Sequence, residues 1–460
     1  MINTIEEKLN KTENRTMLTD LYQLTMNASY FDNFKNQEAT FDLFIRKLPK
    51  DWGFFIAAGI EDAIDYATNL RFEKEDIEYL REQGIFKEDY LDHLENFGFN
   101  GDIYAVKEGT PIGADTPILR VTGSRMEAQF LETMLLNTIN FQTLIATKAN
   151  RVVNEAAPAK VIDFGLRRAQ EKDAAMKGAR ACYIAGVVGT SNVMAGKEYG
   201  IPINGTHAHS FVMSFPTELE AFRAYVKTFP DNPTLLIDTY DTIEGARNAA
   251  IVGKELEQKG KKLGAVRLDS GDLAYLSKMV RSTLDNKGLD YVKIIATNDL
   301  NEYKIAELKE REAVIDGFGV GTEMITAKPV AAIPGVYKLV EDDQGGRIKL
   351  SEGKKSFPGK KQIYRIEENG KYRHDVLALE DELVEGIPLL EKVVENGERI
   401  VGRRELEEIR KYCLEEVAKM PEEIRIVNVE NPYKVQISAG LNTMAENLKI
   451  KYAKGNGKLK

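Results

Sequence analysis

The sequence predicts an α/β fold: an irregular α/β barrel of about seven parallel strands, with an N-terminal α/β domain and a C-terminal α+β extension. From about residue 160, short β-type apolar segments alternate with segments of helical periodicity. Such alternation is typical of a parallel sheet. Nearly every predicted strand ends in Asp, Gly, Thr or Asn, and a barrel gathers such ends at one face. An open, doubly wound sheet is the alternative fold.

The N-terminal domain is predicted to cover residues 1–123. Thr19 or Asp20 can cap a helix that carries an apolar stripe, and alternating apolar residues indicate a strand shortly after it. Gly and Pro residues separate the later β-type segments, as in a compact sheet domain. The predicted elements are a helix from residue 18, a strand at 39–46, helices at 74–83 and 87–97, and strands at 103–106 and 118–121.

The middle domain is predicted to cover residues 124–340. Ser124 and Glu127 have the spacing of a capping box, so a long buried helix should begin there. Strands are expected at 160–164, 187–190, 201–204, 235–239, 265–268, 294–296 and 317–320. Helices between them are expected at 242–259, 273–287 and 302–311.

The C-terminal subdomain, residues 341–460, contains β-type segments separated by charged turns. A helix at 403–419 carries one apolar face. This subdomain is expected to pack on the N-terminal domain, and the basic residues 451–460 should form a frayed tail.

The composition limits the possible functions. A net charge of −9 argues against broad nucleic-acid binding. The two cysteines, Cys182 and Cys413, indicate a reducing compartment and exclude a zinc framework. Neither a signal peptide nor an apolar segment of about 20 residues is found, so we expect a cytoplasmic protein without a membrane partner.

Residues 205–215 hold two of the four histidines, His207 and His209, in what reads as a loop after a strand. Such loops carry the chemistry of α/β proteins. A metal site would need a third ligand, which is not found nearby. A buried, hydrogen-bonded histidine and a nucleophilic histidine remain the two interpretations. Asp238, at another strand end, could hold one ring nitrogen of His209 and leave the other free for attack.

Charged residues at other strand ends suit an anionic substrate. Arg167 follows one strand, and Arg267 and Asp269 share a face at the end of another. Ser270 and Gly271 then lead into a helix whose N-terminal amides favour phosphate. Asp269 is the best candidate to hold Mg²⁺ beside a polyphosphate. The alternative interpretations are surface charge for the arginines and helix capping for the acidic residues.

Glycines at the strand end 317–322 would let backbone amides approach an anion closely. Neither a dinucleotide fingerprint nor a P-loop is present. The residues by themselves therefore indicate a phosphate-handling α/β enzyme with Mg²⁺ and a candidate nucleophilic histidine, and they do not identify its substrate.

Taken together and in this order, the motifs resemble those of the nicotinate phosphoribosyltransferase family. One motif alone is only modestly specific, whereas the ordered set is highly specific. The matching segments are 18–26, 163–170, 189–193, 205–211, 267–272, 319–322 and 335–339.

The resemblance implies the first step of NAD salvage from nicotinate. Nicotinate and phosphoribosyl pyrophosphate would give nicotinate mononucleotide and pyrophosphate, driven by ATP hydrolysis with Mg²⁺. The family carries a phosphohistidine on the histidine followed by Ser-Phe, which is His209 here, so His207 is interpreted as incidental or supporting. The resemblance also implies a homodimer with shared active sites, in which Tyr22 enters the site of the partner subunit.

The resemblance assigns further substrate contacts, and Asp238 and Asp269 are expected to act with His209 in catalysis. Tyr22 and Phe164 should enclose the pyridine ring, and Thr206 and Arg267 should contact nicotinate. The remaining expected contacts are Arg167 near the reacting phosphates, Gly319, Gly321 and Thr322 at the ribose phosphate, and Ser191, Ser270, Gly271 and Asn298.

Three other functions compete with this interpretation. Relatives that use nicotinamide carry an acidic residue in the segment matching 189–192, whereas Ser191 and Asn192 are neutral, which favours nicotinate. A metal-dependent aldolase would need a Schiff-base lysine or a three-ligand metal site, and neither is found. A catalytically inactive nucleotide-binding relative should lack His209 or Asp269, and both are present.

Overall fold

The structure is a computed structural model that describes residues 14–34, 37–350 and 356–455. The chain forms two compact units. Unit 1 comprises Met1–Leu144, Ala332–Ile424 and Val429–Lys460, and unit 2 comprises Ile145–Ala331 and Arg425–Asn428. The division into three domains made from the sequence stays a prediction. The predicted tail 451–460 lies partly in helix α17 (Ala439–Gly455), and residues 456–460 lie outside the description.

Unit 1 contains a seven-stranded sheet in the order β12-β11-β1-β5-β3-β16-β17. Its strand β1 (Glu38–Ile45) pairs antiparallel with β5 (Pro117–Ser124) and with β11 (Gly335–Asp342). Strands from the two ends of the chain thus share one sheet. The others are β3 (Asp102–Ala105), β12 (Gly345–Gly346), β16 (Glu391–Glu395) and β17 (Glu398–Arg399).

A second sheet of unit 1 has the order β15-β13-β14-β18, and β2 (Phe55–Ile56) pairs with β4 (Pro111–Ile112). The second sheet consists of β13 (Lys361–Glu368), β14 (Lys371–Leu379), β15 (Ile387–Pro388) and β18 (Val435–Ile437). The helices are α2 (Leu21–Asn33), α3 (Ile60–Thr68), α4 (Lys74–Glu82), α5 (Glu88–Leu94), α6 (Arg125–Phe130) and α16 (Leu406–Lys419).

The long helix predicted from residue 124 is two helices, α6 and α7 (Glu132–Ala156), separated at Leu131. Half of the predicted capping box is confirmed, because the Ser124 hydroxyl accepts a hydrogen bond from Glu127 N at 3.3 Å. The Glu127 carboxylate instead accepts from Asn100 N at 3.0 Å. No helix in the described part of the chain is both long and apolar enough to cross a membrane.

Unit 2 is built on a parallel sheet, as predicted. Its five strands are β6 (Lys160–Asp163), β7 (Thr234–Leu236), β8 (Ala265–Leu268), β9 (Lys293–Ala296) and β10 (Gly317–Val320), in the order β6-β10-β9-β8-β7. The two other predicted strands are reduced to single parallel bridges, which join Asp163 to Thr190 and Thr190 to Ile203.

The predicted barrel is not confirmed, because the sheet is open at β7. Ile237 N donates to Arg267 O in β8, so the preceding amide, Leu236 N, points to the other edge of the strand. There it donates to the ring of His207 at an N···N distance of 3.3 Å. No strand among the described residues pairs with β7 on that edge, and an imidazole satisfies the amide in place of a closing strand.

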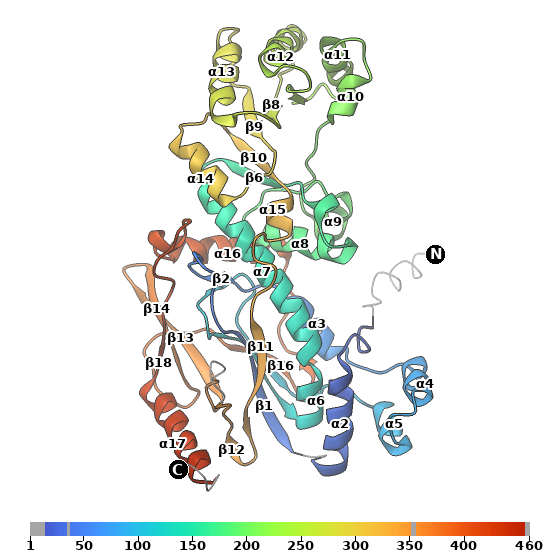
Figure 1. Cartoon of the computed structure of the whole chain (residues 1–460), viewed down its shortest axis with the longest axis vertical. Helices are drawn as coiled ribbons and strands as arrows, with labels where there is room; N and C mark the ends of the chain where they lie inside the picture. Colours follow the sequence, from blue (N-terminus) through green and yellow to red (C-terminus); the bar gives the residue numbers. More distant parts are fainter. Residues whose placement is uncertain (1–13, 35–36, 351–355, 456–460) are drawn as a thin grey trace. The chain divides into compact units, whose positions relative to one another are not determined.

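Helices connect the strands of unit 2, and α11, α12 and α13 lie side by side in Figure 1. Short polar side chains cap them, among them Asp241 for α12, Asp272 for α13 and Asn301 for α14. The bounds are α8 (Lys172–Ile184), α9 (Val193–Tyr199), α10 (His209–Met213), α11 (Glu218–Thr228), α12 (Thr242–Glu257), α13 (Leu273–Asp285), α14 (Glu302–Glu310) and α15 (Thr322–Ile325), with a short 3-10 helix η1 (Leu166–Arg168).

Candidate active site

The predicted site residues of unit 2 all follow, or end, segments of the parallel sheet. Because these segments run in the same direction, their carboxyl ends share one edge, where α/β proteins bind ligands. The residues gathered there are Phe164, Arg167, Ser191, Thr206, His209, Asp238, Arg267, Asp269, Ser270, Gly271, Asn298, Gly319, Gly321 and Thr322. Tyr22 lies in α2 of unit 1, where it is 45% exposed.

His209 is the first residue of α10, and its side chain is 41% exposed. Its Nδ1 lies 3.2 Å from the Thr239 hydroxyl, and its Nε2 lies 3.7 Å from Asp269 Oδ2. The predicted pairing of His209 with Asp238 is therefore wrong: the next residue, Thr239, contacts the ring instead. A hydroxyl on one nitrogen and a carboxylate near the other can orient the imidazole.

Asp238 binds the loop that follows β8 and does not contact the ring of His209. Its Oδ2 accepts hydrogen bonds from Asp269 N at 2.9 Å and from the Ser270 hydroxyl at 2.5 Å. Asp269 is held from its other side by the Thr297 hydroxyl. Sequence reasoning missed Thr297, although it directly follows β9, the same kind of position that drew attention to Asp238 and Asp269. These contacts fix the carboxylate that faces His209.

His207 has a structural role, which agrees with its interpretation as supporting. The ring is buried, and Tyr225 packs on it edge to face with ring centroids 4.7 Å apart. Burial, and secondly the charge of Arg267, lowers the pKa of His207 to about 4. The ring is thus neutral near pH 7, as it must be to accept the hydrogen bond from Leu236 N.

Positive charge converges beside the histidine. Arg267 is half-buried in β8 and donates from Nη2 to His207 O at 3.1 Å, while its buried Nε has no hydrogen-bond partner among the described residues. Burial is the main cause that lowers the pKa of Arg267; Asp269 and Asp238 oppose it, and Arg167 acts in the same direction. Two neighbouring arginines with unused donors suit a carboxylate or phosphate.

The aromatic side chain of Phe164, which follows β6, lies against the neighbouring strand β10. A Cβ on Gly319 would lie 2.6 Å from the ring of Phe164 and 2.7 Å from the Thr297 methyl. Only glycine therefore lets the Phe164 ring lie over β10. Behind it, buried Asp163 accepts from Gly165 N at 2.8 Å and from the Thr190 hydroxyl at 2.7 Å, which fixes the loop that carries Phe164 and Arg167.

The two neutral residues after Thr190 have different positions. Asn192 is buried and caps α9, accepting from Ala195 N at 3.1 Å. Its amide is committed to this cap, so Ser191, which is partly exposed, is the one able to meet a ligand. The Thr206 hydroxyl donates to His207 O at 3.2 Å, the carbonyl that also binds Arg267.

The loops after β9 and β10 complete the edge. Asn298 and Asp299 have φ angles of 89° and 45°, a region that is costly for residues other than glycine. Gly321 precedes Thr322, the first residue of α15. Strained backbone of this kind is concentrated at ligand sites in proteins.

The residues present fit a divalent cation. Asp238 Oδ1 is buried without a hydrogen-bond partner, and Asp269 is 38% exposed beside it. No group of three His, Cys, Asp or Glu side chains in the described residues could hold a metal alone. Magnesium usually takes one or two carboxylates and completes its shell with water and substrate phosphates, so two carboxylates suffice.

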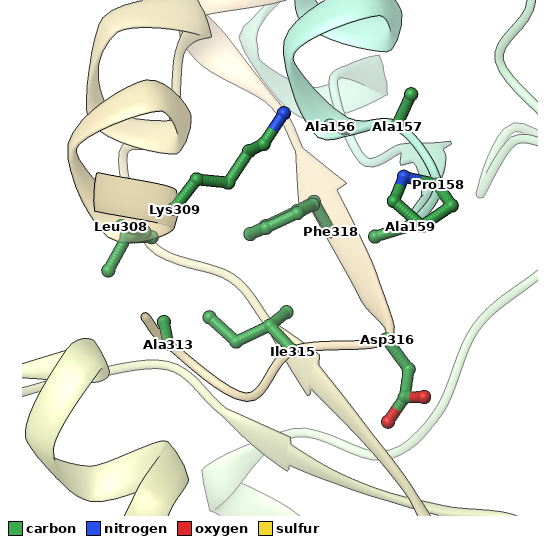
Figure 2. Close-up of a pocket in the computed structure, with 10 residues that line it drawn as sticks. All are labelled: Ala156, Ala157, Pro158, Ala159, Leu308, Lys309, Ala313, Ile315, Asp316 and Phe318. Carbon is green, nitrogen blue, oxygen red and sulfur yellow. The ribbon is translucent and has the colours of Figure 1, made fainter. Parts of the chain in front are cut away.

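A cavity of about 260 Å³ lies at the opposite edge, where β6 and β10 begin (Figure 2). Its walls are mostly apolar, and the cation there, Lys309, donates to Glu155 O at 2.9 Å. It offers little to a phosphate and is separate from the residues above. Its lining residues are Ala156, Ala157, Pro158, Ala159, Leu308, Lys309, Ala313, Ile315, Asp316 and Phe318.

Comparison with known families gives three matches. Residues 17–140 match the nicotinate phosphoribosyltransferase N-terminal domain, residues 159–331 the nicotinate phosphoribosyltransferase family, and residues 384–445 the nicotinate phosphoribosyltransferase C-terminal domain. Together they cover most of the chain.

Individual relatives agree with these matches. A nicotinate phosphoribosyltransferase of Mycobacterium tuberculosis is 40% identical over 95% of this chain and 94% of its own length. One of Bacillus subtilis is 39% identical over 93% and 94%. Among solved structures, human nicotinic acid phosphoribosyltransferase superposes with a TM-score of 0.83 at 26% identity, covering 94% of this chain and 99% of the human one.

Proposed function

Because the chain belongs to the nicotinate phosphoribosyltransferase family, we propose that it transfers the phosphoribosyl group of phosphoribosyl pyrophosphate to nicotinate. The products are nicotinate mononucleotide and pyrophosphate, in the first step of NAD salvage from nicotinate. The observation that carries the proposal is the shared sheet edge, where Arg267 and Arg167 lie near the His209–Asp269 pair and the Phe164 ring lies over Gly319 of β10. An acid, an aromatic ring and phosphates are the groups such an edge can bind.

Nicotinate binds with its ring against Phe164 and its carboxylate toward Arg267 and Thr206. The Nε of Arg267 is buried and has no hydrogen-bond acceptor among the described residues. The carboxylate of nicotinate can accept this hydrogen bond in place of the water that burial excludes. The phosphate groups of the second substrate lie along Arg167, Ser270, Gly271, Asn298 and the loop Gly319–Thr322. Backbone amides and an arginine are the usual ligands of phosphate in such loops.

ATP hydrolysis is coupled to the transfer through His209. The neutral ring attacks the γ-phosphoryl group, the bond to the β-phosphate oxygen breaks, and ADP leaves; water later releases phosphate from the ring. Asp269, 3.7 Å from Nε2, stabilises the charge that develops on the ring, and Thr239 orients Nδ1. Asp238 and Asp269 would hold Mg²⁺, which neutralises phosphate charge during transfer.

The same edge favours nicotinate over nicotinamide. A carboxylate meets positive charge from Arg267, and neutral Ser191 adds no repulsion. A nicotinamide-using enzyme is the second candidate, and an inactive nucleotide-binding relative is the third. Product analysis with either substrate, with and without ATP, separates them. Nicotinate mononucleotide should form from nicotinate, faster with ATP than without it. Formation of no nucleotide from either substrate would contradict the proposal.

We also propose a homodimer with shared active sites, in which Tyr22 of one subunit closes the ring pocket of the other. The side chain of Tyr22 is 45% exposed in this chain, as a residue that meets a partner should be.

The prediction for the dimer concerns mixed subunits. Tyr22→Ala and His209→Ala proteins should each have almost no ATP-coupled activity, because each lacks one part of every site. Random re-pairing of the two should restore about a quarter of the sites, since half the dimers are mixed and each mixed dimer has one intact site. Activity of the mixture and the sedimentation coefficient measure this. A fully active monomer would contradict the shared site.

A further inference from the structure

A buried ion pair lies behind the phosphate loops of unit 2, away from every group assigned to the chemistry. Lys148 of α7 donates from Nζ to Glu302 Oε2 of α14 at 2.5 Å, and each side chain is 1% exposed. Arg151, one turn further along α7, lies 3.2 Å from Glu302 Oε1. Lys148 Nζ also donates to Lys328 O at 2.8 Å. One buried ammonium thus joins α7 to two different loops.

Both of those loops are strained. Glu302 opens α14 three residues after Asp299, which like Asn298 has a positive φ angle. Lys328 follows Ala327, a fully buried residue with a φ of 52°. Such conformations are unfavourable for residues with a side chain and persist only where the surroundings enforce them. The ion pair supplies that constraint from inside the unit.

A second set of contacts ties the two loops to each other. Glu323 in α15 receives a hydrogen bond from Asn301 Nδ2 at 3.3 Å and pairs with Lys328 Nζ at 2.9 Å. Asn301 belongs to the loop after β9, whereas Glu323 follows Thr322. The Asn298 loop and the first turn of α15 therefore form one connected structure.

Stability alone does not account for a buried lysine–glutamate pair. Removing two charges from water costs several kcal/mol each, and apolar side chains of similar volume often stabilise a fold equally well or better. What an ion pair adds is a defined geometry. Here that geometry is imposed on the Asn298 loop, which is expected to contact phosphate, and on the loop that follows α15, the helix that opens at Thr322.

We propose that Lys148 and Glu302 are positioning residues, which hold the Asn298 loop and α15 in the arrangement that binds the phosphates of phosphoribosyl pyrophosphate. This inference rests on the proposed function. It implies that weakening the pair reduces affinity for phosphoribosyl pyrophosphate selectively, because the contacts of nicotinate with Phe164 and Arg267 come from β6 and β8.

The test is the variant Glu302→Gln, which keeps the size of the side chain and removes its charge. We expect the Kd for phosphoribosyl pyrophosphate, measured by titration calorimetry, to rise about tenfold or more, while the KM for nicotinate stays within about twofold. Glu302→Asp, which keeps the charge and retracts the carboxylate, should give a smaller rise of about threefold. If Glu302→Gln does not fold, Glu302→Asp answers the same question.

The matched control is Asp375→Asn in unit 1. Asp375 is 0% exposed and pairs with buried Arg365 at 2.9 Å, so the same chemical change is made in a buried pair of the other unit. It should lower the melting temperature and leave the affinity unchanged. Folded Glu302 variants with wild-type affinity, or with equal losses for both substrates, would overturn the inference alone. Wild-type protein that binds no phosphoribosyl pyrophosphate would overturn the proposed function and, with it, this inference.

Discussion

The His209→Ala protein is expected to hydrolyse no ATP and to carry no acid-labile phosphate, while it still forms nicotinate mononucleotide slowly and without ATP. His209 is the exposed imidazole of the site, with Thr239 on one nitrogen and Asp269 near the other. Without this imidazole, the γ-phosphoryl group of ATP has no nucleophile in the site to accept it. The phosphoribosyl transfer does not use this ring, so a basal rate remains. Incubation with γ-labelled ATP, followed by acid treatment, measures the protein-bound phosphate.

His207 provides the control. Its side chain is buried and binds the amide of Leu236, so His207→Ala should lower stability by about 2–4 kcal/mol and keep both activities within about tenfold, a barrier change near 1.4 kcal/mol. His207→Gln, whose amide oxygen can accept from Leu236 N, should retain more stability. Label that persists on His209→Ala protein and vanishes from His207→Ala protein would reverse the assignment.

The second large effect is substrate choice. We expect nicotinate to be preferred over nicotinamide by about a hundredfold or more in kcat/KM, because a neutral amide leaves a buried guanidinium without its counter-charge. Arg267 is that guanidinium, and its buried Nε has no hydrogen-bond partner in the part of the chain that the structure describes.

Ser191→Asp gives the converse test. A carboxylate at this partly exposed position would repel nicotinate and accept a hydrogen bond from an amide, so the preference should fall by about tenfold or more. Asn192→Asp would place charge in a buried cap and should chiefly reduce stability. Equal turnover of nicotinate and nicotinamide by the wild-type enzyme would contradict the predicted pocket.

Much of the fold could be predicted, because alternation of strands and helices is a local signal. Strands β6, β8, β9 and β10 lie within one residue of their predicted limits, whereas β7 ends three residues before its predicted end. The closure of the sheet could not be predicted. It depends on whether β7 meets another strand, and the decisive contact is a histidine side chain 29 residues earlier in the chain. The local sequence pattern of β7 does not show whether its free edge is paired with a histidine side chain or with the backbone of another strand.

The members of the site could be predicted better than their contacts. Strand ends identified Asp238, Asp269 and Arg267, since such positions share one edge in any parallel sheet. Which of two adjacent residues faces His209 depends on the twist of a loop, so Thr239 was missed and Asp238 was misassigned. The neutrality of Asn192 was used together with that of Ser191 to argue for nicotinate, although the Asn192 amide caps a helix.

The pairing of β1 also determines the order in which the protein can assemble during synthesis. Its partner β5 leaves the ribosome some 80 residues later, whereas its other partner, β11, follows only after all of residues 145–331. Until then one edge of β1 has no strand beside it, and an open apolar edge invites pairing with other chains. All five strands of the unit 2 sheet lie within residues 145–331, so that sheet can be completed first. Nascent chains that end before residue 335 should therefore depend most strongly on chaperones.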